Sequence, residues 1–290
     1  MKVLIVSNDS AGAEIISSWV RLHSNNTYDF ILGPPAEKIF KRKLLLITNN
    51  SSDNLENLIQ DFDLVITGTS QTSDLEKRAI FLSKKYNIKV ISILDYWVNF
   101  ASRFIFKNDL IYPDEIWVTD KYSLANAKEE LTGANILLKN NPYIEELLLN
   151  KISKSIDRIG VNILYVCQPY NEDNLTDIEA LDYFFSTVIK LKKITKRVKL
   201  RLHPLEEISK YQDLINKYKN ILHITQSYNS ILSDDLNWSD IVVGMHAQAL
   251  AVAVEFGLNA FYCIPSHGKK CVLPHEEITN FSEYIKLKKI

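Results

Sequence analysis

The chain has 290 residues, of which 46% are hydrophobic and 24% charged. This balance excludes a mainly disordered or low-complexity chain, and the length predicts one large domain or two of moderate size. Lys and Arg number 34 against 35 for Asp and Glu, a net charge of −1. No bulk positive field therefore favours binding to nucleic acid.

The cysteines, Cys167, Cys263 and Cys271, form no CxxC pair, and they are too scattered for a disulfide framework or a structural zinc site. A reducing cytoplasm is therefore expected. The apolar run Val3–Val6 is too short for a signal sequence, and no run reaches the roughly 18 apolar residues of a membrane span. We expect a cytoplasmic protein that holds no metal and has no transmembrane segment. Peripheral contact with the inner face of the membrane stays open.

The first half of the chain alternates short β-branched runs with amphipathic stretches. This βαβα order predicts a parallel sheet with helices on both faces. The expected strands are Val3–Val6, Phe30–Leu32, Leu44–Ile47, Leu64–Ile66, Val90–Leu94 and Ile116–Val118. The expected helices are Ala13–Leu22, Asp74–Tyr86 and Tyr122–Leu131.

The same rhythm restarts near Val161, after the polar segment Lys151–Gly160. The sequence therefore predicts an α/β protein of two doubly wound, Rossmann-like domains, residues 1–152 and 153–290, with a cleft between them. The expected strands are Ile163–Cys167, Val198–Leu202, Leu222–Thr225, Ile241–Gly244 and Ala260–Ile264. The expected helices lie near Ile178–Lys193, Glu207–Tyr218, Asn229–Asn237 and Ala247–Phe256.

Ligands of such sheets bind beyond the carboxyl ends of the strands. The residues just after each strand are therefore the candidates for a site. The chain contains no GxGxxG, GxxxxGK[ST], HExxH or GxSxG motif that would identify a site directly.

The string Ser7–Glu14, SNDSAGAE, follows the first strand and opens a helix. Small residues such as Gly12 let a ligand approach the helix N-terminus, with Ser10 beside it. Asp9 is either a general base at this position or only the N-cap of the helix, and the two roles are compatible.

Two further strings follow strands of the first half. In Thr67–Ser70, the hydroxyls of Thr69 and Ser70 suit a sugar or a phosphate, or else they cap a helix. Leu94–Phe104 combines an acid, an amide, an arginine and aromatic side chains, which together can bind a sugar or an acidic group. The alternative is a loop that covers the core with its aromatic residues turned inward. The candidate ligand-binding residues of this loop are Asp95, Trp97, Asn99 and Arg103.

In the second half, the string Arg201–Glu206, RLHPLE, spans the end of a strand. Strand alternation places Arg201 and His203 on one face, and Pro204 ends the strand. His203 can then donate a hydrogen bond to a phosphate at the mouth of the loop, with Arg201 and Glu206 on either side. A purely structural histidine is the other interpretation.

The strand before Gly244 leads into a nearly all-apolar helix that is expected to begin near His246. Core packing explains the helix but not the polar residues at its start, where an anion can bind. The candidates at this helix start are Gly244, Met245, His246 and Gln248. The last loop adds His275, while its His267 and Cys271 lack the partners of a zinc shell.

The RLHP string, the SDIVVGM strand with its helix, and the IPSHGKKCVLPH loop resemble the donor half of bacterial GT-B glycosyltransferases. Sialyltransferase-like and capsule-polysaccharide enzymes carry a His-Pro motif and a later polar helix start in this order. In those families both motifs bind the nucleotide, often CMP. The resemblance implies that His203 and Pro204 bind the donor. At the second motif the chain has His246, Ala247 and Gln248 where a Ser or Thr is typical.

The strings SNDSAGAE, TGTS, LDYWVNFASRF, PDEIWVTD and NPY also resemble bacterial surface-carbohydrate proteins over most of the chain. The resemblance implies a metal-independent glycosyltransferase without a cofactor. It would move a sugar from a CMP- or UDP-linked donor to a glycan or lipid-linked acceptor, with Asp9 or Asp95 as the base and His203 stabilising the leaving phosphate. The donor group would be Arg201, His203, Pro204, Glu206, Gly244, Met245, His246, Gln248 and His275. The acceptor group would be Ser10, Gly12, Thr69, Ser70, Trp97, Asn99 and Arg103.

Two other functions remain open. The first is a nucleotide-sugar epimerase on the same scaffold, which would use His275, Glu276 and Asp95 around one sugar. The second is a non-catalytic protein that binds a sugar or a nucleotide.

Overall fold

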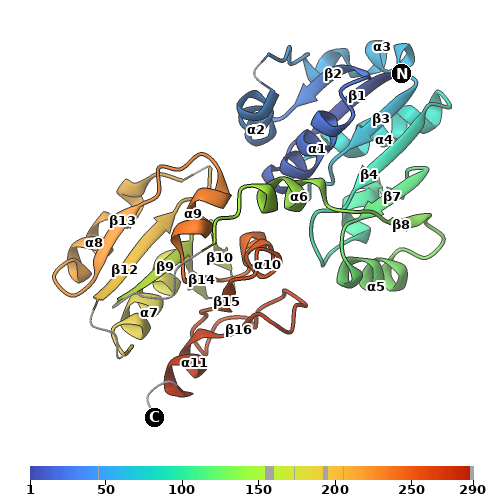
Figure 1. The fold of residues 1–290 in the computed structure, drawn as a ribbon. Helices are drawn as coiled ribbons and strands as arrows, with labels where there is room; N and C mark the ends of the chain where they lie inside the picture. The colour runs from blue at the N-terminus through green and yellow to red at the C-terminus, as the bar shows by residue number, and fades with distance from the viewer. Residues whose placement is uncertain (45, 154–159, 173, 192–194, 205, 288–290) are drawn as a thin grey trace. The chain divides into compact units, whose positions relative to one another are not determined.

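The computed structural model describes residues 1–44, 46–153, 160–172, 174–191, 195–204 and 206–287 (Figure 1). The chain divides into two compact units, Met1–Glu146 and Leu147–Ile290. Each unit has its own six-stranded sheet, flanked by helices. The predicted α/β class with two doubly wound domains is confirmed.

The sheet of the N-terminal unit is parallel throughout, with the strand order β2-β1-β3-β4-β7-β8. Its strands are β1 (Lys2–Ser7), β2 (Thr27–Leu32), β3 (Leu64–Thr67), β4 (Lys89–Ile93), β7 (Glu115–Val118) and β8 (Ile136–Leu138). The short strands β5 (Ile105–Phe106) and β6 (Asp109–Leu110) form a separate hairpin. The helices are α1 (Ser10–Leu22), α2 (Pro34–Leu44), α3 (Leu55–Leu58), α4 (Leu75–Lys85) and α5 (Lys121–Glu130). Helix α6 (Pro142–Leu149) begins in this unit and contains the boundary after Glu146.

Strand β1 lies in the interior of this sheet, and Val3, Leu4, Ile5 and Val6 are all fully buried. A strand covered on both faces needs such an unbroken apolar run rather than an alternating one. Leu4 and Val6 belong to the same core cluster as residues of α4 and α5. The apolar run thus fixes β1 and aims its carboxyl end, Ser7, at the edge where α1 begins.

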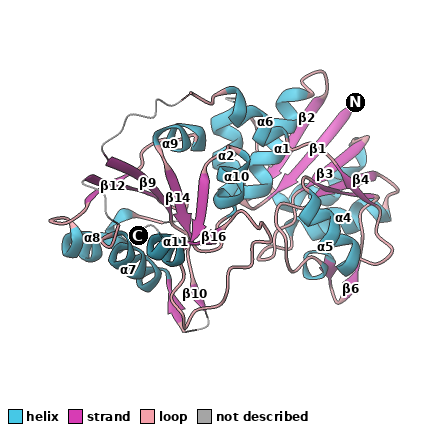
Figure 2. Ribbon diagram, turned by 60° about the horizontal axis from the view of Figure 1, so that its bottom comes forward, coloured by secondary structure: helices cyan, strands magenta, loops and turns pink. Residues whose placement is uncertain are grey.

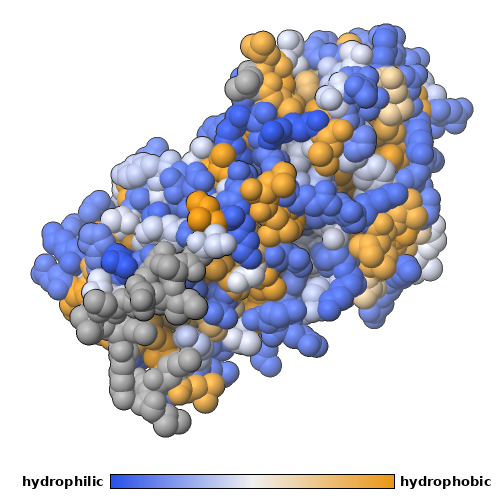
Figure 3. Space-filling view, viewed as in Figure 1, coloured by the Kyte–Doolittle hydropathy of each residue, from blue (hydrophilic) through white to orange (hydrophobic). Residues whose placement is uncertain are grey.

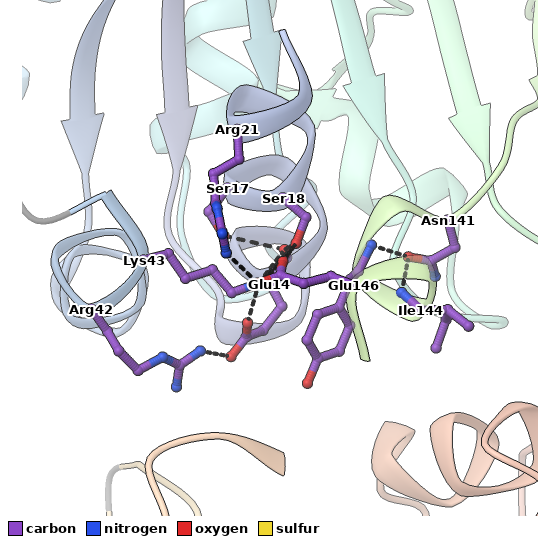
Figure 4. A network of polar contacts seen from close by, with 10 residues as sticks. Glu14, Ser17, Ser18, Arg21, Arg42, Lys43, Asn141, Ile144 and Glu146 are labelled. Carbon is purple, nitrogen blue, oxygen red and sulfur yellow. Dashed lines mark hydrogen bonds and ion pairs between the residues drawn. The ribbon is translucent and has the colours of Figure 1, made fainter. Parts of the chain in front are cut away.

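A charged network joins α1, α2 and α6 in the N-terminal unit (Figure 4). Arg42 and Lys43 both pair with Glu14 of α1. Lys43 Nζ also lies 3.2 Å from Glu146 Oε2, and Ser18 Oγ donates to the same carboxylate at 2.6 Å. The last residue of this unit is therefore anchored to α1 and α2.

The sheet of the C-terminal unit is also parallel, with the strand order β13-β12-β9-β14-β15-β16 (Figure 2). Its strands are β9 (Gly160–Val166), β12 (Thr195–Arg201), β13 (His223–Gln226), β14 (Ile241–Gly244), β15 (Asn259–Tyr262) and β16 (Thr279–Asn280). A hairpin of β10 (Asn171–Glu172) and β11 (Leu175–Thr176) precedes the first helix. The helices are α7 (Asp177–Val188), α8 (Gln212–Tyr218), α9 (Leu232–Trp238), α10 (Gln248–Glu255) and α11 (Phe281–Leu287).

Both sheets contain a point at which the strand order reverses. In the N-terminal sheet, β1 has β2 on one side and β3 on the other. In the C-terminal sheet, β9 lies between β12 and β14. Loops that leave such a pair of strands in opposite directions leave a crevice at the carboxyl edge, which is where ligands of this architecture bind.

The predicted strand at Leu44–Ile47 is wrong. Leu44 ends α2, residue 45 lies outside the described residues, and Leu46 is 93% exposed. Among the described residues, a single isolated bridge, between Phe30 and Asn49, continues the sheet beyond β2. A short apolar run forms a strand only where it can pair with the edge of a sheet. The run alone does not show whether such an edge is available.

The other predicted strands and helices are confirmed in position, with ends that differ by a few residues. The structure adds elements that the sequence analysis did not predict: α2, α3, α6, α11, β8, β16 and the two hairpins. Parts of the predicted linker, of the predicted helix ending at Lys193 and of the RLHPLE string lie outside the described residues, at 154–159, 192–193 and 205. No helix in the described ranges is long and apolar enough to cross a membrane.

Candidate functional site at the carboxyl edges of the two sheets

At the N-terminal sheet, the loops after β1 and β3 meet at the reversal point. Asp9 occupies the N-cap position of α1, but its side chain makes no capping hydrogen bond. Instead its Oδ1 accepts from Asn8 Nδ2 at 2.9 Å and from Ser70 Oγ at 3.0 Å. Asp9 is therefore at a cap position, but its carboxylate is held by the neighbouring loop.

Glu76, in the first turn of α4, brings a second acid to this edge. Its side chain is 1% exposed, and its Oε1 accepts from the backbone N–H of Asn8 at 2.7 Å. Burial raises the pKa of Glu76 to about 8, and the negative charges of Asp9 and Asp95 act in the same direction. The sequence analysis missed Glu76. The available signal was an acid within the helical stretch that directly follows TGTS.

Asp95, which follows β4, is the third acid. It is 7% exposed, and Arg103 Nη1 lies 3.2 Å from its Oδ1. Burial raises the pKa of Asp95, while the Arg103 guanidinium opposes that shift. Arg103 also donates to the backbone oxygen of Thr69, so it ties the loop after β4 to the loop after β3.

The loops after β3 and β4 lie close to Gly12, at distances where a Cβ atom would still fit. A Cβ atom on Gly12 would lie 3.5 Å from Asp95 Oδ2 and 3.6 Å from the Cα of Gly68. The sequence predicted Gly12 as the place where a ligand comes close to the backbone. In the structure the neighbouring loops already occupy part of that space.

Unmet hydrogen bonding is concentrated at this edge. Four buried side-chain atoms here have no hydrogen-bond partner among the described residues: Ser7 Oγ, Ser10 Oγ, Glu76 Oε2 and Arg103 Nε. Buried polar atoms are nearly always paired in folded proteins. The edge therefore has a surplus of polar groups that packing does not explain.

The aromatic residues of the predicted acceptor loop pack inward. Trp97 is 5% exposed and its Nε1 donates to Asp120 Oδ2 at 2.9 Å, while Phe100 and Phe104 belong to the core. Asn99 is exposed and adopts a left-handed φ of 58°, which Asn tolerates better than most residues. These aromatic residues therefore fit the alternative of a loop that covers the core. The exposed surface of Trp97 is too small for much contact with a sugar.

At the C-terminal sheet, the loops after β9 and β14 meet at the corresponding reversal point. Gln168 Oε1 accepts from the backbone N–H of His246 at 2.9 Å. The rings of Tyr170 and His246 lie 5.5 Å apart, and His246 Nδ1 lies 3.4 Å from the backbone N–H of Val272. Sequence reasoning missed Gln168 and Tyr170, although the string CQPY follows a predicted strand as the other candidates do.

Helix α10 begins at Gln248, with Ala247 as its N-cap and no side-chain capping bond. Gln248 is half-buried, and Met245 is 1% exposed within a small apolar cluster. Gly244 is the last residue of β14. Met245 is therefore a core residue in this structure, while Gln248 and Ala249 at the start of α10 are half-buried.

Arg201 is committed to a buried carboxylate. Its Nη1 lies 2.7 Å from Asp235 Oδ2 and donates to the backbone oxygen of Asn229 at 3.0 Å. Asp235 is fully buried and also accepts from Ser227 and Asn229. The predicted donor-binding arginine thus holds the loop between β13 and α9 in place.

The loop that carries His203 and Pro204 is anchored by Glu206. The backbone N–H of Glu206 donates to the His203 oxygen at 2.9 Å. The Glu206 carboxylate accepts from the Lys210 ammonium at 2.7 Å and lies 2.7 Å from the Tyr211 hydroxyl. His203 is half-buried and Pro204 is exposed at this edge.

His275 lies away from these loops in the sequence, and its side chain is buried, at 6% exposure. Its backbone oxygen accepts from the N–H of Ile278 at 3.1 Å, which closes a turn before β16. Within the described ranges, no group of three or more His, Cys, Asp or Glu side chains could hold a metal ion.

No protein-family model and no curated protein sequence matches this chain. Solved structures do match. The UDP-GlcNAc 2-epimerase of Methanocaldococcus jannaschii, in complex with UDP-GlcNAc and UDP, is similar at a TM-score of 0.68 and 13% identity, over 100% of this chain and 92% of that one. The chain has a GT-B-like fold.

Other enzymes with this GT-B-like fold are similar as well. The UDP-GlcNAc 2-epimerase of Neisseria meningitidis has a TM-score of 0.64 at 12% identity, over 92% of this chain and 83% of that one. MurG of Acinetobacter baumannii has a TM-score of 0.55 at 9% identity, over 92% of this chain and 81% of that one. At such identities the likeness establishes the GT-B-like fold, and the chemistry has to be argued from the residues at the two edges.

Proposed function

We propose that this protein is a glycosyltransferase that uses a nucleotide sugar, with Asp9 as the base that accepts the proton of the acceptor hydroxyl. The orientation of the Asp9 carboxylate carries this proposal, because it stands at a helix N-cap without capping the helix. Asp9 is also half-buried, whereas Glu76 and Asp95 are buried. It is therefore the acid of the three that a substrate can reach, and one reachable base suffices for transfer to a hydroxyl.

The charge at the N-terminal edge supports a neutral acceptor. Asp9 and Asp95 are acids, and the Arg103 guanidinium at this edge already pairs with Asp95. A phosphate or a carboxylate would meet repulsion here, while sugar hydroxyls can donate to the acids. We propose a neutral glycan, free or lipid-linked, as the acceptor.

The C-terminal edge supports nucleotide binding. Tyr170 offers a half-buried ring beside the buried ring of His246, and Gln168 offers an amide and His203 an imidazole, all after strands at the reversal point. The first turn of α10 adds backbone N–H groups that favour an anion. We propose that this edge binds the donor nucleotide and that His203 stabilises the leaving phosphate. Uridine nucleotides are the first to test, because the Methanocaldococcus jannaschii complex contains UDP-GlcNAc and UDP.

A nucleotide-sugar epimerase is the second candidate. The observation that favours it is the gathering of three carboxyl groups at one edge, more than a transferase base requires. Epimerisation removes a proton from carbon and returns one to the other face, so it needs more than one acid or base. Several structurally similar proteins are UDP-GlcNAc 2-epimerases.

A product assay by NMR separates these functions. UDP- and CMP-linked sugars are incubated with the protein, with and without a mixture of neutral oligosaccharides. Release of the nucleotide that requires the oligosaccharide supports the transferase. Conversion of the sugar nucleotide alone supports the epimerase, and binding without conversion would leave a non-catalytic protein.

A further inference from the structure

The loop that carries Asp9 rests on a buried acid that the proposed chemistry does not use. The backbone N–H of Asn8, directly before Asp9, donates to Glu76 Oε1 at 2.7 Å. Asn8 in turn donates through its own side chain to Asp9 Oδ1 at 2.9 Å and to Ser70 Oγ at 3.3 Å. Glu76 thus fixes the backbone of the residue whose side chain holds the proposed base.

Space around Glu76 is tight. A Cβ atom on Gly68 would lie 3.2 Å from Glu76 Oε1 and 3.2 Å from Ser7 Oγ. The side chain is 1% exposed, and its Oε2 is buried without a hydrogen-bond partner. Glu76 is therefore closely packed between the loops after β1 and β3, where its hydrogen bond to Asn8 joins the two.

The charged groups around Glu76 are mostly of its own sign. Asp9 faces it from the loop after β1 and Asp95 from the loop after β4, where Arg103 is already paired with Asp95. On its own helix, Lys77 pairs with Asp74. None of the ion pairs found among the described residues includes Glu76.

We propose that Glu76 is a positioning residue for Asp9, which holds the loop after β1 through Asn8 and does so in its uncharged form. This inference rests on the proposed function of Asp9. A charged Glu76 would be a buried anion without a cation, beside two further acids. To hydrate it, the loops around Gly68 and Asn8 would have to move apart, and the Asp9 carboxylate would lose its orientation.

The first test needs no substrate. Asparagine is labelled with ¹⁵N, and the Asn8 amide resonance is followed from pH 5.5 to 9.5. Because burial raises the pKa of Glu76 to about 8, the resonance is expected to shift with a midpoint near that pH. The Glu76→Gln variant keeps an oxygen for the Asn8 N–H but cannot ionise, so the shift should vanish. A resonance that does not titrate in the wild type, or that still titrates in Glu76→Gln, would overturn the proposal.

Stability gives an independent readout with a definite sign. The folded state raises the pKa of Glu76 above its ordinary 4.5, so folding favours the protonated acid. The stability of the wild type relative to Glu76→Gln should therefore fall as the pH rises from 4.5 to about 8 and stay level above that. A difference that is constant across this range would contradict the proposal. The exposed Glu129→Gln serves as the matched control and should show no such trend.

A third test measures turnover, because Glu76 should affect catalysis through Asp9. Turnover of the wild type is expected to decline above pH 8, and Glu76→Gln should retain turnover at pH 7 without that decline. Glu76→Leu, which leaves the Asn8 N–H without its acceptor, should lose turnover at every pH while nucleotide affinity is unchanged. A wild-type decline that persists in Glu76→Gln would count against the positioning role. If no sugar nucleotide is converted at all, the proposed function fails, but the titration of Asn8 still decides the inference about the loop.

Discussion

Two aspartates of the N-terminal unit occupy the same local position, each between a strand of the sheet and the helix that follows. Asp120 caps α5, with its Oδ1 accepting from the backbone N–H groups of Tyr122 and Ser123 at 2.8 and 2.7 Å. Asp9 precedes α1 in the same way, but its Oδ1 binds Asn8 and Ser70 instead. The sequence analysis predicted the cap position of Asp9, and it placed Asp120 between a predicted strand and a predicted helix without naming it as a cap. The sequence does not predict the difference, because Ser70, one of the two residues that bind the Asp9 carboxylate, comes from a loop some sixty residues later.

Replacing Asp9 should affect chemistry rather than folding. We expect Asp9→Asn to lower turnover by about a hundredfold or more, the typical contribution of a general base. Stability should change little, because the amide can still accept from Asn8. The control is Asp61→Asn, an exposed aspartate before the amino end of β3. Full turnover in Asp9→Asn would remove Asp9 from the role of base.

Replacing Asp120 should have the opposite effect. Asp120→Ala removes a helix cap and the partner of the Trp97 indole, and should cost about 1–2 kcal/mol of the free energy of unfolding. Urea denaturation measures this cost. Turnover per folded molecule should be unchanged, and a loss of turnover equal to that of Asp9→Asn would show that the loop before α5 belongs to the site.

Among the elements, the loop between β13 and α9 owes its shape to one buried carboxylate. Asp235 accepts from Arg201, Ser227 and Asn229, and Lys199 Nζ lies 3.4 Å from its Oδ1. The sequence showed Arg201 at a strand end and so suggested a ligand contact. Its actual partner could not be predicted, because nothing in the string LSDDLNW shows which of its acids is buried.

Removing this carboxylate should destabilise the protein strongly. Asp235→Ala leaves Arg201 and Lys199 without their counter-charge in a partly buried setting, and we expect a loss of about 3–5 kcal/mol. The neighbouring Asp234 is exposed, and Asp234→Ala should stay within about 0.5 kcal/mol of the wild type. If urea denaturation gave the same loss of unfolding free energy for Asp235→Ala and Asp234→Ala, the ion pairs of Asp235 would contribute little to stability.

Helix α6 shows a signal that was present in the sequence but not used. Pro142 is its first residue, and Asn141 Oδ1 accepts from the backbone N–H groups of Tyr143 and Ile144 at 3.1 and 3.3 Å. Asn followed by Pro at the first helical position is a common helix start. By contrast, β8 has three residues that are half-buried or exposed, and no pattern of that length separates a strand from a loop.

At the scale of the molecule, the repeated strand–helix rhythm was enough to predict two α/β units. It was not enough to predict the strand orders, which depend on which buried runs pair across the sheet. Those orders decide the site, because they bring Asp9 beside Ser70 and Gln168 beside His246. The contact of Glu76 with Asn8 therefore became visible only in three dimensions, whereas Gln168 and Tyr170 follow a predicted strand and could have been proposed from the sequence.

The division into two units predicts which strands a bound nucleotide protects from hydrogen exchange. We expect UDP to slow amide hydrogen exchange in β9, β12 and β14 while β1 and β3 are unaffected, because a ligand stabilises the unit that binds it. At a UDP concentration of about 100 times the dissociation constant, the unfolding free energy of that unit should rise by about 2.7 kcal/mol. His203→Ala should abolish the protection, and the exposed His223→Ala at the amino end of β13 should retain it. If UDP, without an acceptor, slowed exchange in β1, the nucleotide would bind the N-terminal unit and this prediction would be wrong.

The interior position of β9, the first strand of the C-terminal sheet, has a kinetic consequence. Ile163 of β9 pairs with Val198 of β12 and, on its other side, with Ile241 of β14, far along the chain. Parallel partners so distant are slow to find each other, because the intervening chain must be ordered before the contacts form. While the ribosome is still making the stretch between them, one side of β9 is an unpaired apolar edge. The N-terminal unit, complete by Glu146, can fold during that time, so the C-terminal sheet is where we expect chaperones to be needed and misfolding to begin.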